Sequence, residues 1–140
     1  MKDNTIQKIN SFFSKNPIAK GTPVNQEQIL DAEKELGISF DKDYAFFLLH
    51  YGGSMIKATE IYGLGTNSEL MSDEDIIELT KSYRDDEDGE IDWLIIGSDY
   101  SGNAVGINKE GKVITYDHDL DEYYILGDTF EDYILKSLEE

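Results

Sequence analysis

The stretch DYSGNAVGINKE at residues 99–110 has the oxygen-bearing side chains of a calcium-binding loop. The first, third, fifth and twelfth places, which are ligand positions in an EF-hand, are filled by Asp99, Ser101, Asn103 and Glu110. An EF-hand also needs a glycine at the sixth place and a helix on each side. The sixth residue is Ala104, where an alternation typical of a strand begins. We therefore expect a polar turn followed by a hairpin, and no calcium site.

The two histidines are the remaining candidates for metal ligation. His50 lies in an aromatic helical segment, where a packed or hydrogen-bonded imidazole is expected. His118 stands between Asp117 and Asp119, but one histidine among scattered carboxylates does not define a metal geometry. The absence of cysteine excludes disulfides, thiol nucleophiles and cysteine-bound zinc. We expect no metal and no cofactor.

No motif in the sequence indicates catalysis. The nucleophile motif G-x-S-x-G is absent. Residues 63–68 carry two of the three glycines of a nucleotide-binding motif, but no parallel βαβ pattern follows them. The 30 acidic residues produce close carboxylate pairs by chance, so such pairs do not indicate an acid–base mechanism. The sequence predicts a protein that is not an enzyme.

Acidic residues dominate the composition. Thirty Asp and Glu against twelve Lys and Arg give a net charge of −18, which repels nucleic acid and anionic lipid and speeds encounter with basic proteins. The densest acidic run consists of Asp85, Asp86, Glu87, Asp88, Glu90 and Asp92. It is either a solvated loop between a helix and a strand or a docking surface for a basic protein, whose rim charges would accelerate association.

Aromatic residues close to the acids in the sequence are candidate anchors for such a partner, because buried aromatics hold protein complexes together. Tyr83 precedes the acidic run, and Tyr100 follows the next strand. Tyr123 and Tyr124 are further candidates, and in a strand one of them must face away from the other. Asp117 and Asp119 complete the candidate binding residues.

Helical periodicity dominates the first half of the chain. In a first helix, Ile6, Ile9, Phe12 and Phe13 recur at helical spacing, and the pattern ends before Asn16-Pro17. The second helix is expected to begin at Asn25, which forms a capping box with Gln28, and to end at Gly37. The third is expected to begin at Asp41 and to end at Gly52-Gly53. The aromatic stripe of the third helix, from Tyr44 to Tyr51, is at core spacing.

Strands dominate the second half. Residues 55–62 are predicted to form a strand, and Ser72 to cap a helix with Asp75 at its third position. Short strands follow at residues 91–97, 104–107, 113–116 and 123–126, the first of them central because it is apolar on both faces. Thr129 caps a final helix. The prediction is a single α+β domain over residues 1–140, an antiparallel sheet with helices packed against it.

The sequence offers no membrane segment. It contains no apolar run of about 18 residues, and its N-terminus is polar from the first residues. A cytoplasmic protein is the simplest expectation.

The order and spacing of several motifs resemble the SUKH superfamily. The matching residues are Ile29-x-x-x-Glu33-x-x-Leu36-Gly37-Ile38, Tyr44, Phe47, Leu48, Gly52-Gly53, Trp93 to Asp99, Gly102-Asn103, Gly111-Lys112-Val113, Tyr116 to Asp119, and Thr129-Phe130-x-x-Tyr133-Ile134. Together the matched blocks span about four fifths of the chain. The family usually has Leu-Pro where this chain has Phe40-Asp41, a mild departure because aspartate caps a helix where proline starts one.

The resemblance implies an antiparallel sheet with helices packed against it, and binding in place of catalysis. The superfamily includes a fungal cell-wall synthesis regulator and many bacterial immunity proteins. It implies an immunity protein that sequesters a cognate toxin domain, often a nuclease, whose basic active-site rim an acidic surface can cover. The alternative is a regulatory scaffold with an endogenous protein partner. An exposed edge of the strand meander could also pair two copies of the chain.

Overall fold

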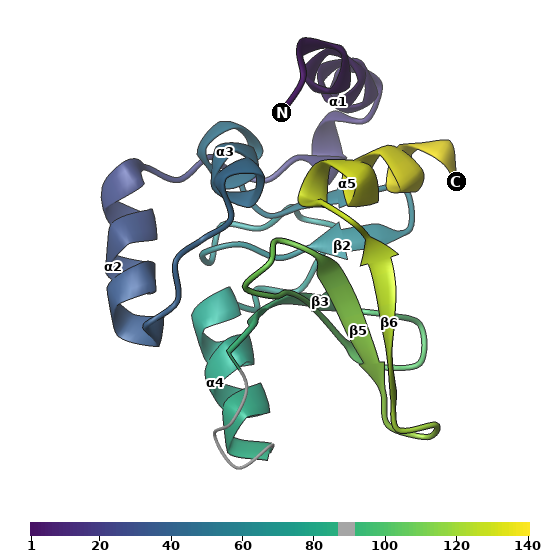
Figure 1. The fold of residues 1–140 in the computed structure, drawn as a ribbon. Helices are drawn as coiled ribbons and strands as arrows, with labels where there is room; N and C mark the ends of the chain where they lie inside the picture. The colour runs from purple at the N-terminus through teal and green to yellow at the C-terminus, as the bar shows by residue number, and fades with distance from the viewer. Residues whose placement is uncertain (87–91) are drawn as a thin grey trace.

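The computed structural model describes residues 1–86, apart from the side chain of Asp86, and residues 92–140. The elements in order are α1 (Asp3–Lys15), η1 (Pro17–Ala19), α2 (Gln26–Leu36), α3 (Lys42–Tyr51), β1 (Ser54–Ile56), β2 (Thr59–Ile61), α4 (Ile76–Asp86), β3 (Leu94–Ser98), β4 (Ala104–Ile107), β5 (Val113–Asp117), β6 (Glu122–Gly127) and α5 (Phe130–Glu139) (Figure 1). Strands β3-β4-β5-β6 form an antiparallel sheet in that order, and β1 pairs with β2. The predicted α+β fold is confirmed.

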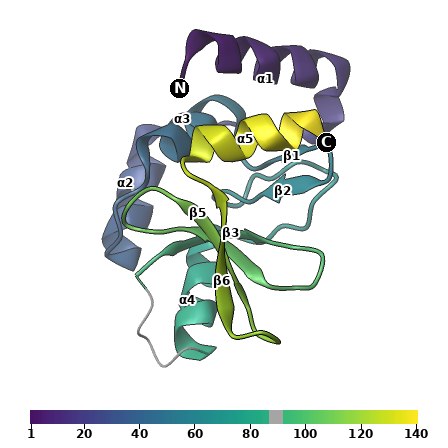
Figure 2. The same ribbon diagram turned by 45° about the vertical axis from the view of Figure 1, so that its right-hand side comes forward.

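One face of the four-stranded sheet belongs to the main core. Its contributions to that core are Leu94, Ile96, Val105, Ile107 and Val113. They join the apolar faces of the helices, where Tyr44, Phe47 and Phe130 are fully buried. Figures 1 and 2 show α1, α3 and α5 gathered on one side of the molecule, with α4 apart from them beside β3.

Helix boundaries follow the predicted capping residues. The Gln28 amide donates to Asn25 Oδ1 at 2.9 Å and the Asn25 amide donates to Gln28 Oε1 at 2.9 Å, which is the predicted capping box. Gly37 ends α2 with φ of 69°. Asp41 and Thr129 accept hydrogen bonds from the first turns of α3 and α5.

The predicted start of α4 was wrong. The helix begins at Ile76, and the Ile77 amide donates to Asp75 Oδ1 at 2.7 Å, so Asp75 caps the helix in place of Ser72. Ser72 stays in the preceding loop because its carbonyl accepts a hydrogen bond from Asn67 Nδ2 at 3.1 Å. The pKa of Asp75 is raised, chiefly because burial disfavours the ionised carboxylate.

The single strand predicted for residues 55–62 is a short hairpin. Its two strands turn back on each other beside Lys57, whose φ of 54° lies in the left-handed region. Met55 pairs with Glu60 in the antiparallel register. The run of β-branched and aromatic residues concealed this turn, because it contains no glycine or proline.

The prediction that residues 91–97 form a central strand was also wrong, because β3 lies at one edge of the sheet. It is apolar on both faces because neighbouring elements cover its outer edge. The Tyr62 amide donates to the Ile96 carbonyl at 2.9 Å. On the α4 side, the Ile95 amide donates to Oγ1 of the fully buried Thr80 at 3.0 Å. The other edge of the sheet is β6, which has no strand on its outer side among the described residues.

No helix within residues 1–86 and 92–140 combines the length and the apolar character that a membrane span requires.

Candidate protein-interaction surface

Five rings form a chain of contacts over the face of the sheet opposite the main core, around a second, smaller core that includes Trp93. We call this surface the aromatic face; it consists of Tyr83, Trp93, Tyr116, His118 and Tyr123. Ring centroids lie 5.1 Å apart for Tyr83 and Trp93, and 6.3 Å apart for Trp93 and Tyr123. Tyr116 lies 4.8 Å from both Tyr123 and His118, and His118 lies 6.4 Å from Tyr83. Three of these pairs pack edge to face, and the Tyr83–His118 and Tyr116–Tyr123 pairs are tilted.

Strand register brings most of these rings together. Tyr116 on β5 pairs with Tyr123 on β6. Ile114, two residues before Tyr116 in β5, pairs with Ile125, two residues after Tyr123 in β6. Since side chains alternate between faces of a strand, both pairs project from the side opposite the main core. Tyr83 comes from helix α4, which packs against β3 and places the Tyr83 ring beside Trp93.

Trp93 reaches across the sheet because β4 has a glycine beneath it. A Cβ atom at Gly106 would lie 2.3 Å from Trp93 Cε3, closer than carbon atoms can approach. The indole therefore lies over β4 and comes within reach of the Tyr123 ring on the far edge strand. Trp93 is only 4% exposed and forms the floor of the aromatic face.

The part of the aromatic face nearest β6 is open to solvent. Tyr123 is 61% exposed and its neighbour Ile125 is 56% exposed. Leu120, at the β5–β6 turn, is also exposed. An apolar and aromatic area of this kind, next to polar residues, is typical of a protein-binding surface.

Exposed carboxylates adjoin rings of this surface along the chain, whereas Asp117, which pairs with Glu122, belongs to the other face of β5. Asp85 is exposed in the last turn of α4, two residues after Tyr83. Asp117 and Asp119 flank His118, and Asp117 Oδ1 accepts the amides of Asp119 at 2.9 Å and Leu120 at 3.2 Å. Asp117 therefore closes the β5–β6 turn, while Asp119 is exposed.

The other predicted binding residues lie elsewhere or outside the described residues. Asp92 forms an exposed ion pair with Lys109, at 3.1 Å. Tyr100 is 92% exposed at the β3–β4 turn and stacks on no other described ring. The side chain of Asp86 and the residues Glu87, Asp88 and Glu90 fall outside the described part of the chain. The structure thus brings Tyr83 and Tyr123 into one surface but not Tyr100.

Tyr124 faces the opposite side of the sheet from Tyr123, as the alternation predicts. Its hydroxyl donates to Glu122 Oε2 at 2.8 Å. This hydrogen bond to a carboxylate is the main cause of the raised pKa of Tyr124. Glu122 and Tyr124 therefore give the second face of β6 a polar, acidic character.

Residues 99–110 form turns and a strand, as predicted. Asp99 Oδ1 accepts the amides of Ser101 at 2.9 Å and Asn103 at 2.8 Å, which closes the β3–β4 turn. Glu110 lies in the next turn, beyond β4. His50, predicted to be packed or hydrogen-bonded, stacks on Phe46 and lies 2.9 Å from its carbonyl oxygen. Within the described residues, no three His, Asp or Glu side chains are grouped as metal ligands.

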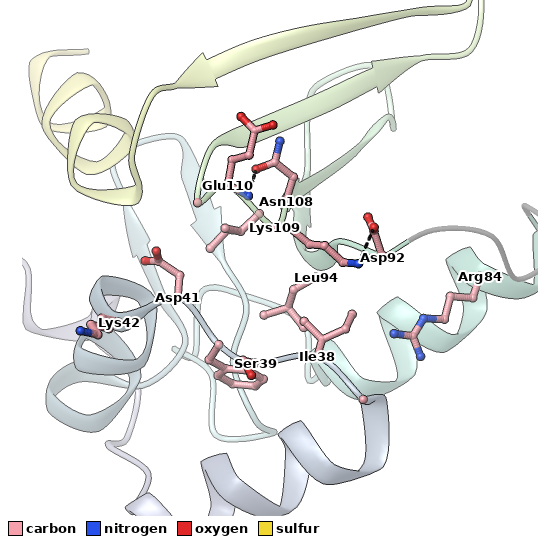
Figure 3. Close-up of a pocket in the computed structure, with 14 residues that line it drawn as sticks. Ile38, Ser39, Asp41, Lys42, Arg84, Asp92, Leu94, Asn108, Lys109 and Glu110 are labelled. Atoms are coloured by element: carbon pink, nitrogen blue, oxygen red, sulfur yellow. Dashed lines mark hydrogen bonds and ion pairs between the residues drawn. The ribbon is translucent and has the colours of Figure 1, made fainter.

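A separate pocket of about 620 Å³ lies between the α2–α3 connection, the start of β3 and the β4–β5 turn (Figure 3). Its charged lining residues are Asp41, Asp92, Glu110, Lys42, Arg84 and Lys109. Burial is the main cause of the raised pKa of Asp41, which caps α3. Lys109 reaches Asp92 across the rim. Because three acids face three bases, this pocket does not favour a ligand of either charge.

The family of the chain follows from comparison with known proteins. The family described as SMI1-KNR4 cell-wall, SUKH_5, matches residues 3–139. The chain belongs to the SUKH superfamily. SUKH proteins are associated with toxin immunity and with SMI1/KNR4 cell-wall regulators, are generally not catalytic, and bind protein partners such as toxins. None of the curated proteins compared with this SUKH chain matches it.

Sequence reasoning missed three residues of the SUKH chain's aromatic face. Trp93 was predicted only to lie in a central strand, His118 was considered only as a metal ligand, and Tyr116 was part of a strand with no assigned face. A period-two pattern could have found them, because Ile114, Tyr116 and His118 alternate along one strand and Tyr123 and Ile125 along the next. The contact between Trp93 and Tyr123 depends on tertiary structure and has no local signal.

Proposed function

We propose that this chain is an immunity protein that binds and neutralises a cognate toxin domain in the cytoplasm of the producing cell. The observation that carries the proposal is the aromatic face, where an exposed Tyr123 stands beside the buried Trp93 and exposed carboxylates adjoin the rings along the chain. The family association with toxin immunity supports the same function. We further propose that residues 1–140 act as one domain, without catalysis, metal or cofactor.

A nuclease is the proposed class of toxin. Nucleases bind a polyanion, so the rim of their active site tends to be basic. A chain with a net charge of −18 attracts such a rim over a distance of about one Debye length, roughly 8 Å at physiological salt. Once in contact, the aromatic face supplies apolar area and the carboxylates pair with cations, so that nucleic acid can no longer reach the active site.

Co-expression with the toxin domain encoded directly upstream of this gene tests the proposed function. We expect cells that make both proteins to survive and cells that make the toxin alone to die. The two purified proteins should form a one-to-one complex in size-exclusion chromatography with light scattering. Unprotected cells, in the presence of folded immunity protein, would contradict the proposal.

The acidic run provides a second prediction, which concerns rates. The variant replaces Asp85, Asp86 and Asp88 by Asn and Glu87 by Gln. At low salt it should associate with the toxin domain about tenfold more slowly than the wild type, and its association rate should depend less on salt, because exposed rim charges act mainly on the association rate. Stopped-flow fluorescence at several salt concentrations measures both effects. Neutralising Asp31 on α2 together with Glu69, Asp73 and Glu74 in the loop before α4 is a control of equal charge change. If the control slows association as much, net charge and not the location of the run is responsible.

An endogenous regulatory partner is the alternative function, which the cell-wall description of the family supports. The two functions differ in gene context, because an immunity gene directly follows its toxin gene. Recovery of one endogenous protein in a stable complex from cells that lack any toxin gene would favour the regulatory scaffold.

A further inference from the structure

Strand β6 is an edge strand with an unusually apolar, exposed sequence. It pairs with β5 on one side, and no described strand pairs with its other side. Four of its residues in succession, from Glu122 to Ile125, are exposed. Edge strands are ordinarily protected by lysine, proline, bulges or covering segments, because their free backbone groups attract other strands. Here the exposed stretch contains no lysine or proline, Glu122 is its one charge, and the register shift of β6 against β5 falls just beyond it, at Leu126.

The register shows which backbone groups are free. In an antiparallel ladder, residues alternate between pairs that exchange backbone hydrogen bonds and pairs that do not. The Asn108 amide donates to the Lys112 carbonyl at 3.0 Å in the β4–β5 turn. Two residues further along β5, the backbone of Ile114 therefore faces β4, and that of Thr115 faces β6.

Thr115 pairs with Tyr124, so the backbone of Tyr124 faces β5. The neighbouring residues, Tyr123 and Ile125, consequently direct their N–H and C=O groups away from the sheet. At the end of the strand, Lys136 Nζ donates to the Leu126 carbonyl at 3.3 Å, which covers that part of the edge. The free stretch is therefore short and centred on Tyr124.

The two faces of β6 differ in chemistry, and this difference selects a partner. A strand added beside β6 would place alternate side chains next to Tyr123 and Ile125 on the aromatic face, and the others next to Glu122 and Tyr124. We propose that β6 binds an extended segment of the partner protein in which apolar residues alternate with Lys or Arg. The apolar residues pack on the aromatic face, and the cations pair with Glu122 and with the acids of the β5–β6 turn.

Charge favours this partner over a second copy of the chain. The acids next to β6 in the sequence are Asp117, Asp119, Asp121 and Asp128. Pairing of two β6 strands would bring both sets together, between molecules that each carry a charge of −18. Like charges at this range oppose association, whereas a cationic strand is attracted. The inference deepens the proposed function, because the basic partner is the class of protein proposed above.

A peptide experiment tests the edge without any toxin. The probes are two capped octapeptides, one of four Val-Lys repeats and one of four Val-Glu repeats, each titrated into the ¹⁵N-labelled full-length chain. We expect the Val-Lys peptide to shift the amide resonances of residues 122–126 and their β5 partners, with at least tenfold weaker effects from Val-Glu. Shifts confined to other elements, equal effects of both peptides, or none at all, would overturn the proposal while leaving the proposed function standing. A free protein that is already dimeric, with β6 amides protected from exchange, would assign the edge to a second copy and also overturn it.

A pair of variants then tests the edge in the complex with the upstream-encoded toxin domain. Ile125→Ala removes side-chain contact but keeps the outward N–H, whereas Ile125→Pro removes the N–H as well. We expect Ile125→Pro to weaken binding at least tenfold more than Ile125→Ala. Equal losses would contradict strand addition. Hydrogen exchange of the wild-type complex tests the same point without relying on the proline variant to fold. The Tyr123 and Ile125 amides should become protected from exchange when the toxin domain binds, and the proposal is overturned if they do not.

Discussion

Gly106→Ala is expected to lower the free energy of unfolding by about 3 kcal/mol or more, at the upper end of the cost of overpacking a core. The added Cβ would lie 2.3 Å from Trp93 Cε3 and 2.5 Å from the Leu94 carbonyl oxygen. A backbone atom cannot move aside in the way that the end of a flexible side chain can, so the indole and the β3–β4 pairing must both shift. Urea unfolding followed by tryptophan fluorescence measures the change, since Trp93 is the chain's one tryptophan.

The same substitution should weaken partner binding, because Trp93 forms the floor of the aromatic face and holds the Tyr123 ring in place. A double-mutant cycle with Trp93→Leu separates the clash of the added Cβ with the indole from its clash with the Leu94 carbonyl oxygen. The smaller leucine relieves the contact with the indole but not the contact with the Leu94 carbonyl, so we expect Gly106→Ala to cost less in that background. Circular dichroism reports unfolding of the double variant, which has no tryptophan. An unchanged cost would show that the indole does not lie over Gly106.

Local signals predicted the elements of the fold well. Asn25, Gly37, Asp41 and Thr129 mark helix ends through hydrogen bonds and backbone conformations that involve only their near neighbours in the chain. The bounds predicted for β4, residues 104–107, agree with the structure. Capping and turn chemistry is local, so a single sequence carries it in full.

Strand position within the sheet could not be predicted in the same way. The stretch around Ile95 and Ile96 is apolar on both faces, as a central strand would be, but β3 is an edge strand covered by Thr80 and Tyr62. Burial fixes the hydrophobic pattern, whether the cover is another strand, a helix or a hairpin. The predicted start of α4 failed for a related reason, because Asn67 holds Ser72 in the loop from five residues away.

The candidate site was predictable in charge but not in shape. The sequence identified the acids and the tyrosines, yet it could not show that Tyr83 on a helix and Tyr123 on the last strand share one surface, whereas Tyr100 stacks on no ring in the described part of the chain. That arrangement depends on Trp93 crossing β4, which needs Gly106 at one position of the register. The residue types that bind a partner are thus visible in the sequence, and their grouping requires the fold.

Tyr123→Ala is expected to weaken binding of the toxin domain by about 2–4 kcal/mol, or roughly 30- to 1,000-fold, within the range of interface hot spots. The matched control is Tyr100→Ala, which removes an equally large and more exposed side chain, 92% against 61%. Since binding energy concentrates in clustered aromatics and not at isolated ones, we expect the control to change affinity less than about threefold. Both variants should unfold at nearly the wild-type urea concentration, because their side chains are largely exposed. Isothermal titration calorimetry measures the affinities, and a larger loss from Tyr100→Ala would move the interface from the aromatic face to the β3–β4 turn.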